Sequence, residues 1–325
     1  MSDDRKMLLE EVISAINFHN NICITSHVNP DGDSIGSVLA LGMALKKNRY
    51  KNITMLVSDE IPKNLLFLPG IDQIQKETHA KKIDLLIALD CGDKNRIGIS
   101  KSLLESTDYI INIDHHITNT NFGNINIINP DASSTGEIVY EILKLMNIDI
   151  DKDIATSLYV GISTDTGSFR YDNTTSSTHA IVSRLLDLGI NSNYININLY
   201  QSRSIEKTCL LIKSLDTLEL LKSGKIAIAI VTREMLEICN TTINEADLII
   251  DFIRDIDSVE VACVLKETDN NTIKVGLRSK NYIDVSLIAK SFNGGGHAKA
   301  SGCTLYSGIE EGKKLILEEI DKAFR

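Results

Sequence analysis

Several features that mark particular protein classes are missing from this chain of 325 residues. It has no tryptophan, only 4 prolines, no CxxC pair and no apolar run long enough to cross a bilayer. The N-terminal residues 1–6 are polar and lead into an amphipathic stretch, which is not the pattern of a signal peptide. We therefore expect neither a membrane span nor a secretory leader.

The six cysteines are scattered along the chain, and several lie inside apolar runs, where cysteine behaves as a small hydrophobic residue. They are Cys23, Cys91, Cys209, Cys239, Cys263 and Cys303. This distribution predicts that all six are reduced and that the protein is cytoplasmic. For Cys91, which follows Asp90 directly, a packed thiol is favoured over a redox-sensitive one.

Basic residues are outnumbered, since 34 Lys and Arg stand against 44 Asp and Glu, and the net charge is −10. Affinity for duplex DNA depends on a field of basic side chains, so we expect no duplex DNA partner. A phosphate ligand is still allowed, because a bound divalent cation can invert the local field.

The length favours two domains. In the first half, short apolar runs alternate with stretches of helical periodicity, which predicts an α/β domain with a buried parallel sheet. The predicted strands are 21–26, 53–57, 85–89 and 109–113, and the predicted helices are 34–47, 134–146 and 152–164. Beyond residue 204 the pattern changes to a helix at 206–215, a hairpin through 218–231, a strand pair at 259–265 and 272–278, and a short helix from Asp284. We expect an N-terminal domain over 1–190, a linker over 191–207 and a smaller α/β domain over 208–325.

Acidic and imidazole side chains follow the predicted elements of the first domain, at the points where each element ends. These residues are His27, Asp31 and Asp33 after the first strand, Asp90 after the third, Asp114, His115 and His116 after the fourth, and Asp165 near the end of the helix over 152–164. If the strands are parallel, these groups converge on one edge of the sheet.

Such a mixture of carboxylates and neutral imidazoles suits Mn²⁺, Fe²⁺ or Zn²⁺. Without cations the clustered carboxylates would repel one another, and they are more than one ion needs. Two ions sharing a bridging carboxylate is therefore the natural interpretation, and such pairs hydrolyse phosphate esters. Each piece alone has a plainer explanation, because a single Asp at a strand end is more often a helix cap and Asp-Gly-Asp is more often a solvated turn.

The stretches Ser26–Ser34, Asp90, Asp114–His116 and Gly161–Gly167 together resemble the four motifs of the DHH phosphoesterases, in the family's order. Near the C-terminus, 276–279 and 294–302 resemble the DHH-associated domain, so the resemblance covers essentially the whole chain. It is strongest to the bacterial group that degrades very short RNAs (nanoRNAs) and dephosphorylates 3′-phosphoadenosine 5′-phosphate (pAp), with pApA or cyclic di-AMP as substrates in some members.

The resemblance implies a metal-dependent hydrolase with two Mn²⁺ ions and an active site in the cleft between the two domains. One ion would be held by His27, Asp31 and Asp90, and the other by Asp33, Asp90, His115 and Asp165. Asp114 would orient a neighbouring imidazole, and His116 would contact the scissile phosphate or protonate the leaving oxygen. A homodimer is also implied by the resemblance alone.

The C-terminal glycine motif suggests contact with substrate. Consecutive glycines allow close backbone approach to an anion, and an Arg fork suits phosphate. The substrate-binding residues expected here are Arg278, Ser279, Gly294, Gly295, Gly296 and His297. The plainer alternative is that the glycines only cap the preceding helix. Phe169, Arg170 and Tyr171, after the fourth motif, are equally suited to stacking on a base and to a structural role.

Three other functions are alternatives to hydrolysis of short RNA and pAp. A manganese inorganic pyrophosphatase would carry a basic Arg-Lys-Lys type motif where this chain has Gly-Gly-Gly-His. A processive single-strand DNA exonuclease would be longer and would add a nucleic-acid-binding module. A non-enzymatic nucleotide sensor would not need the full set of metal ligands. Which of nanoRNA, pAp, pApA and cyclic di-AMP is the physiological substrate stays open, as does cleavage polarity.

Overall fold

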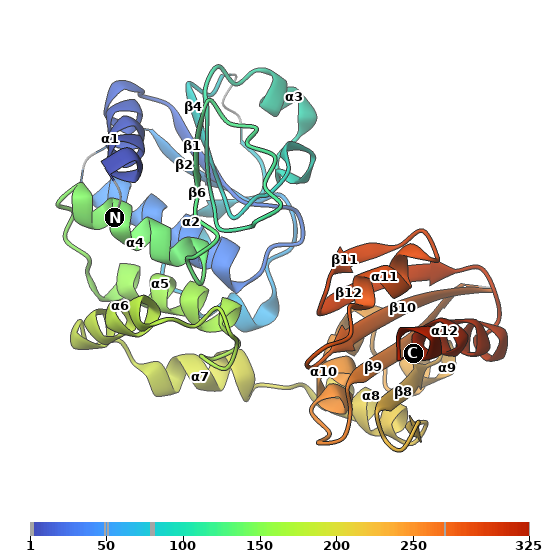
Figure 1. Cartoon of the computed structure of the whole chain (residues 1–325). Coiled ribbons are helices and arrows are strands. Elements are labelled where there is room, and N and C mark those ends of the chain that lie inside the picture. Colours follow the sequence, from blue (N-terminus) through green and yellow to red (C-terminus); the bar gives the residue numbers. More distant parts are fainter. Residues whose placement is uncertain (1–2, 49, 51, 79–81, 270, 325) are drawn as a thin grey trace. The chain divides into compact units, whose positions relative to one another are not determined.

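The computed structural model describes residues 3–48, 50, 52–78, 82–269 and 271–324 (Figure 1). The chain divides into two compact units, Met1–Ser202 and Arg203–Arg325, which we call unit 1 and unit 2. None of the helices in the described ranges is long and apolar enough to cross a membrane.

Unit 1 is built on a six-stranded sheet in which every neighbouring pair of strands is parallel. The strand order is β3-β2-β1-β4-β5-β6. The strands are β1 (Ile22–Thr25), β2 (Ile53–Leu56), β3 (Ile74–Gln75), β4 (Leu85–Leu89), β5 (Ile110–Asp114) and β6 (Ile125–Ile128). The parallel α/β architecture predicted for the first domain is thereby confirmed.

Side chains alternate between the two faces of this sheet, as the strand period of two requires. Ile22 and Ile24 of β1 lie in the large core beneath the long helices, whereas Cys23 lies in a smaller core on the opposite face with Leu103 of α3. Figure 1 shows α2 and α4 on one side of the sheet and α3 on the other. The helices of unit 1 are α1 (Asp3–Phe18), α2 (Gly32–Lys47), α3 (Lys101–Glu105), α4 (Thr135–Leu145), α5 (Lys152–Asp165), α6 (Ser176–Asp187) and α7 (Ser192–Tyr200), with short 3-10 turns at Lys63–Leu65, Ile71–Gln73 and Lys94–Arg96.

The strand order reverses at β1, which lies between β2 and β4. In open parallel sheets such a switch point leaves a crevice at the carboxyl ends of the strands, where ligands bind. The segments that leave β1 and β4 at this point carry His27 and Asp90.

Helices α2 and α5 pack closely because glycines face each other across them. A Cβ atom on Gly36 would lie 2.5 Å from the carbonyl oxygen of Ser157 and 3.0 Å from the backbone nitrogen of Gly161. This close approach brings the C-terminal end of α5, with Asp165, toward the first turn of α2, with Asp33.

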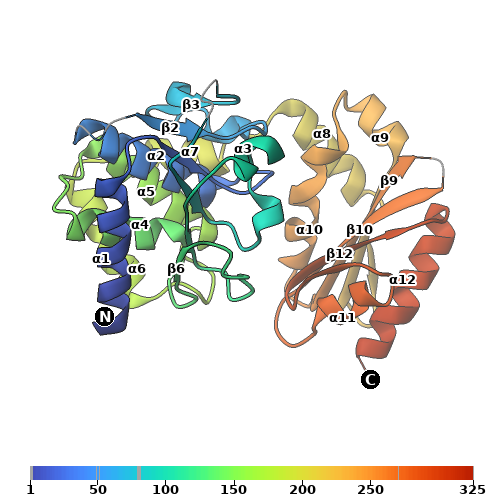
Figure 2. The same cartoon turned by 90° about the horizontal axis from the view of Figure 1, so that it is seen from above.

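Unit 2 contains a mixed six-stranded sheet of order β11-β12-β10-β9-β8-β7, in which only β8 and β9 pair in parallel. Figure 2 shows α10 and α12 on opposite faces of it. The strands are β7 (Glu219–Leu221), β8 (Ile226–Val231), β9 (Val261–Asp269), β10 (Thr272–Ser279), β11 (Gly295–His297) and β12 (Ala300–Leu305). The helices are α8 (Ile205–Leu215), α9 (Arg233–Ile238), α10 (Asp247–Arg254), α11 (Val285–Lys290) and α12 (Ile309–Ala323), with a 3-10 turn at Ile243–Ala246.

The structure departs from two expectations. The segment expected to be a linker, 191–207, is mostly helical, because Asn191 caps α7 and Ile195 is buried in the core of unit 1, while Ser204 caps α8. The expectation that all six cysteines are reduced is wrong, because Cys209 of α8 and Cys239, just after α9, form a disulfide. The packing of these two helices places the Cα atoms of Cys209 and Cys239 5.6 Å apart. The two cysteines are 30 residues apart in the sequence, so their proximity could not be predicted from it.

Candidate metal centre

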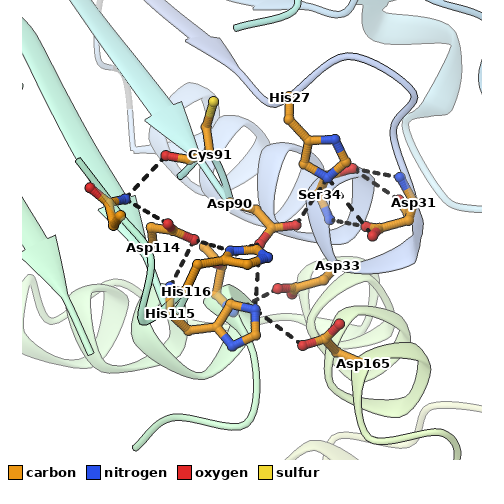
Figure 3. Close-up of polar contacts among 12 residues, drawn as sticks. His27, Asp31, Asp33, Ser34, Asp90, Cys91, Asp114, His115, His116 and Asp165 are labelled. Atoms are coloured by element: carbon orange, nitrogen blue, oxygen red, sulfur yellow. Dashed lines mark hydrogen bonds and ion pairs between the residues drawn. The ribbon is translucent and has the colours of Figure 1, made fainter. Parts of the chain in front are cut away.

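The six residues predicted as metal ligands gather at the carboxyl edge of the unit 1 sheet (Figure 3). They fall into groups whose ligand atoms lie within 4.8 Å of one another. One group is His27, Asp31 and Asp90; another is Asp33, His115 and Asp165; and Asp90 also groups with Asp114, His115 and His116.

The first group is centred on His27, in the segment that leaves β1. Its Nε2 atom lies 3.4 Å from Oδ2 of Asp90 and 3.8 Å from Oδ2 of Asp31. The other ring nitrogen, Nδ1, donates a hydrogen bond of 2.7 Å to the carbonyl oxygen of Val28. That bond fixes the tautomer, so Nε2 is left free to bind a cation. Asp31 also caps α2 by accepting from the backbone nitrogen of Ser34.

The second group is centred on His115. Its Nε2 atom lies 3.2 Å from Oδ2 of Asp165 and 3.6 Å from Oδ1 of Asp90. The two oxygens of Asp90 thus face different imidazoles, Oδ2 toward His27 and Oδ1 toward His115. This is the position that a carboxylate bridging two ions has to occupy.

Asp33 is held by the first turn of another helix. Its side chain is 1% exposed and accepts hydrogen bonds from the backbone nitrogens of Thr135 (2.6 Å) and Gly136 (2.9 Å). The hydroxyl of Thr135 also donates to Oδ1 of Asp90, at 3.2 Å. Thr135 and Gly136 were not predicted from the sequence. The spacing from Ser134 to Glu137 is a capping signal that marks the start of α4, but it does not reveal which residues the start of this helix contacts.

Asp114 orients His116. Its Oδ1 accepts from Nδ1 of His116 at 2.7 Å and from the backbone nitrogen of His115 at 2.9 Å. Its Oδ2 accepts from the side-chain amide of Asn119 at 2.6 Å, and that amide also contacts Asn112. Asn119 was not predicted, because only the fold brings its amide back to the buried carboxylate.

The carboxylates of this cluster repel one another, and burial makes this repulsion stronger. Burial, reinforced by the charge of Asp90, raises the pKa of Asp165 to about 8. Burial and Asp90 also raise the pKa values of Asp31 and Asp33 above their usual range. For Asp90, burial acts in the same direction, but its hydrogen bond with His27 and the neighbouring imidazoles lower its pKa instead.

The pKa values of the His116 and His27 imidazoles are raised, which favours their charged forms. The hydrogen bond with Asp114 raises the pKa of His116 to about 9. Burial acts to lower the pKa of His27, but its hydrogen bond to Asp90 and the charge there raise it overall. Positive charge on these imidazoles would partly offset the repulsion among the carboxylates.

The donor set fits divalent cations. Carboxylates are buried beside one another, Nε2 of His27 is aimed at two of them, and Asp90 is shared between the groups. Cations bound there would reverse the repulsion that raises the carboxylate pKa values.

The expected substrate-binding residues of unit 2 lie on and around β10 and β11. Gly295, Gly296 and His297 form the edge strand β11 and pair with β12, and His297 shares Ala300 as a cross-strand neighbour with Arg278. The helix-end explanation applies to Gly294, whose backbone nitrogen donates to Ala289 at the end of α11.

Ser279 is not brought together with the others. It is buried on the opposite face of β10, and its hydroxyl donates to the carbonyl oxygens of Ile283 (2.6 Å) and Ala298 (3.3 Å).

Two residues near the motifs, Phe169 and Cys91, make contacts typical of a structural role. The ring of Phe169 packs against Tyr159 and His179, with ring centroids 6.1 and 5.5 Å away. Cys91 is fully buried, its Sγ contacts the carbonyl oxygen of Asp93, and burial raises the pKa of its thiol to about 12. This is the packed thiol expected from the sequence.

Comparison with known families gives two matches along the chain. Residues 21–162 match the DHH family, N-terminal domain, and residues 229–325 match the DHHA1 domain. The first match contains His27, Asp31, Asp33, Asp90 and the Asp114–His116 stretch, and the second contains Arg278 and His297.

Individual relatives match over nearly the whole chain. The bifunctional oligoribonuclease and PAP phosphatase NrnA of Thermus thermophilus is 30% identical, with 98% of this chain and 94% of the relative covered. The protein of the same name in Bacillus subtilis is 28% identical, with 94% and 96% covered. The crystal structure of an exopolyphosphatase-related protein from Bacteroides fragilis has a TM-score of 0.91 and 29% identity, with 98% and 96% covered.

Proposed function

Because this chain belongs to the DHH family of phosphoester hydrolases, we propose that it degrades very short RNAs to mononucleotides and converts pAp to AMP and phosphate. The observation that carries the proposal is the position of Asp90, whose two carboxylate oxygens face two separate His–Asp groups. The names of the Thermus and Bacillus relatives supply the substrate classes.

The residues that would hold two Mn²⁺ ions are those of the two groups. His27, Asp31 and Asp90 would bind one ion, and Asp33, Asp90, His115 and Asp165 the other. The imidazoles in each set favour manganese over magnesium or calcium, which prefer all-oxygen sites. Bound ions would supply Lewis-acid chemistry, neutralising the phosphoryl oxygens and activating water for attack on phosphorus.

The chain's own residues then perform the remaining tasks. His116, charged through its hydrogen bond with Asp114, contacts the scissile phosphate and donates a proton to the leaving oxygen. Asp114 keeps the Nδ1 atom of that ring occupied, and Asn119 keeps Asp114 in place. Thr135 and Gly136 hold Asp33 through their backbone nitrogens.

We assign substrate selection to unit 2, through Arg278, His297 and the backbone of Gly294, Gly295 and Gly296. Ser279 acts indirectly by fixing the chain around Ile283 and Ala298. A net charge of −10 disfavours duplex DNA as a partner.

A panel of substrates tests the proposal against the alternatives. The purified protein with Mn²⁺ is given pAp, pApA, cyclic di-AMP, a 5-mer RNA, long single-stranded DNA and pyrophosphate. Turnover of pAp and the 5-mer is expected. Turnover of pyrophosphate alone would make the chain a pyrophosphatase, turnover of long DNA alone an exonuclease, and binding without turnover a nucleotide sensor.

Two variants test the part assigned to unit 2. Arg278→Ala and His297→Ala should lower kcat/KM for pAp and 2- to 5-mer RNA by about ten- to a hundredfold, the usual cost of a charge-assisted contact. Hydrolysis of the small diester bis-p-nitrophenyl phosphate should change far less. Equal losses on all substrates would mean that these residues support the fold or the metal centre instead.

A further inference from the structure

One face of the unit 2 sheet is accessible where β10, β12 and β11 lie side by side. Along β10 the buried side chains, such as Val275 and Leu277, pack beneath α11 and α12, while alternate residues point to the other face and are half-buried or exposed. On β12, Ala300, Gly302 and Thr304 are half-buried in the same alternation. Helix α10 borders this face, since a Cβ atom on Gly276 would lie 3.3 Å from the Ile250 side chain.

Strand register arranges this face in three rows, because cross-strand partners point the same way. The first row contains two expected substrate-binding residues, the middle row consists of glycines, and the third row carries two lysines. The rows are Arg278, Ala300 and His297; Gly276, Gly302 and Gly295; and Lys266, Lys274 and Thr304.

Gly276 and Gly302 of the glycine row, together with the lysine row, line a hollow of about 780 Å³. Gly276 and Gly302 carry no side chains, so they form a low floor of this hollow. Phe292 and Tyr306 also line the hollow, and the Tyr306 side chain is 86% exposed. A flat floor with an accessible aromatic ring and a nearby cation suits a nucleotide, which carries a base and a phosphate.

The two lysines differ in their partners. Lys266 is held by Asp247 of α10, with Nζ 2.7 Å from Oδ1. Lys274 is exposed and forms no ion pair with any residue that the structure describes. An exposed lysine without a partner attracts a phosphate at little cost, whereas Lys266 would first have to leave its carboxylate.

We propose that Lys274, with Thr304 and Tyr306, forms a distal subsite for the third nucleotide of a short RNA whose preceding part contacts Arg278. Lys274 and Arg278 are four residues apart on one strand and one face, about 13 Å. A trinucleotide spans that distance, but the phosphates of a single nucleotide do not. The inference rests on the proposed function, and it explains how one enzyme can hold both pAp and longer nanoRNAs.

The test compares substrates of increasing length on the full chain with Mn²⁺. Lys274→Ala should lower kcat/KM for 3- to 5-mer RNA by about five- to tenfold and leave pAp unchanged, and Lys274→Glu should lower it further. For the 5-mer, kcat/KM should depend less steeply on salt: the negative slope of log kcat/KM against log salt should become shallower by about 0.7, the value for one lost contact to a single strand. Tyr306→Ala should show the same length dependence without the change in salt slope.

Lys314→Ala is the matched control, because Lys314 is exposed on α12, which packs on the opposite face. Equal losses on pAp and the 5-mer, no loss on either, or a matching loss in Lys314→Ala would overturn the distal subsite. Wild-type protein that turns over neither pAp nor RNA would instead overturn the proposed function on which the subsite rests.

Discussion

A Cβ atom on Gly161 would lie 2.7 Å from Oδ1 of Asp33, so only glycine lets α5 pass this close to the buried carboxylate. Gly161→Ala should therefore push Asp33 from its place and weaken metal binding by about ten- to a hundredfold, as loss of a supporting contact usually does. Isothermal titration with Mn²⁺ measures this. Gly312→Ala in α12 is the control, because it lies in unit 2 and its new Cβ would meet only side-chain atoms, of Ile273, Ser307 and Leu305. Unchanged Mn²⁺ affinity in Gly161→Ala would show that Asp33 is not a ligand.

Asp90→Asn should abolish turnover of every substrate, because the bridging position serves both groups. Asn suits this test better than Ala, since Asp90 has a φ of 55°, a region that Asn tolerates well. Metal analysis of the purified variant should show loss of both equivalents, with the circular dichroism spectrum unchanged. Retention of one full equivalent would argue against bridging by Asp90.

His116→Ala should lower kcat by about a hundredfold or more while metal content stays near that of the wild type, because the ring is assigned to proton transfer. Asp114→Asn should have a smaller effect, since the ring stays in place but loses its charged partner. His179→Ala, at a ring that packs on Phe169, is the control and should leave kcat unchanged. If His116→Ala loses a whole metal equivalent, the roles of His115 and His116 have to be exchanged.

Chelation should inactivate the protein, and Mn²⁺ should restore activity better than Mg²⁺ or Ca²⁺ because of the mixed ligand set. Binding should also stabilise the fold by about 2.7 kcal/mol at a free Mn²⁺ concentration a hundredfold above Kd. Thermal unfolding with and without Mn²⁺ checks this, with Asp90→Asn as the variant that should not respond. Full activity in excess EDTA, with no tightly bound metal, would contradict the metal assignment.

Glu260 should make the stability of unit 2 depend on pH. The residue is 3% exposed, and its carboxylate accepts from the backbone nitrogens of Asn281, Tyr282 and Ile283. Burial acts to raise its pKa, but these donors outweigh it, and the pKa lies below the usual glutamate range. A lowered pKa in the folded state means that the stabilisation is present at neutral pH and is lost as the pH falls through the folded value.

Glu260→Gln should accordingly lower the free energy of unfolding by about 1.5–3 kcal/mol at pH 7, the range for hydrogen bonds to a charged group. The difference from wild type should shrink in strong acid, where the Glu260 carboxyl of the wild type is protonated in both the folded and the unfolded state. Urea unfolding at several pH values measures it. A difference that does not vary with pH would assign the effect to packing.

The sequence allowed the framework of unit 1 to be predicted because buried parallel strands are short, continuous apolar runs. The predicted strand 85–89 coincides with β4, and the ligands other than Asp165, which ends a helix, were found because they follow such runs. The contacts of Thr135 and Gly136 with Asp33 could not be predicted in the same way. They join segments that meet only through the packing of α4 on α2.

Unit 2 shows the same limit. The glycine motif at 294–296 has no apolar alternation, so β11 was not expected as a strand; it exists because β12 offers a pairing edge. The segment 191–207 was expected to be a linker because the pattern changes beyond it, but the cap by Asn191 and the burial of Ile195 stabilise helix α7 there. The disulfide between Cys209 and Cys239 likewise follows from the packing of two helices.

The candidate ligands are distributed from His27 to Asp165 on four separate stretches of chain. During synthesis, a nascent chain that has not yet emerged as far as Asp165 can form neither the complete second group nor the contact of α5 with α2. A cation held by these ligands therefore cannot act as an early template for the folding of unit 1. It can bind in full only after the non-local pairing of the parallel strands, which is slow by nature, has been completed.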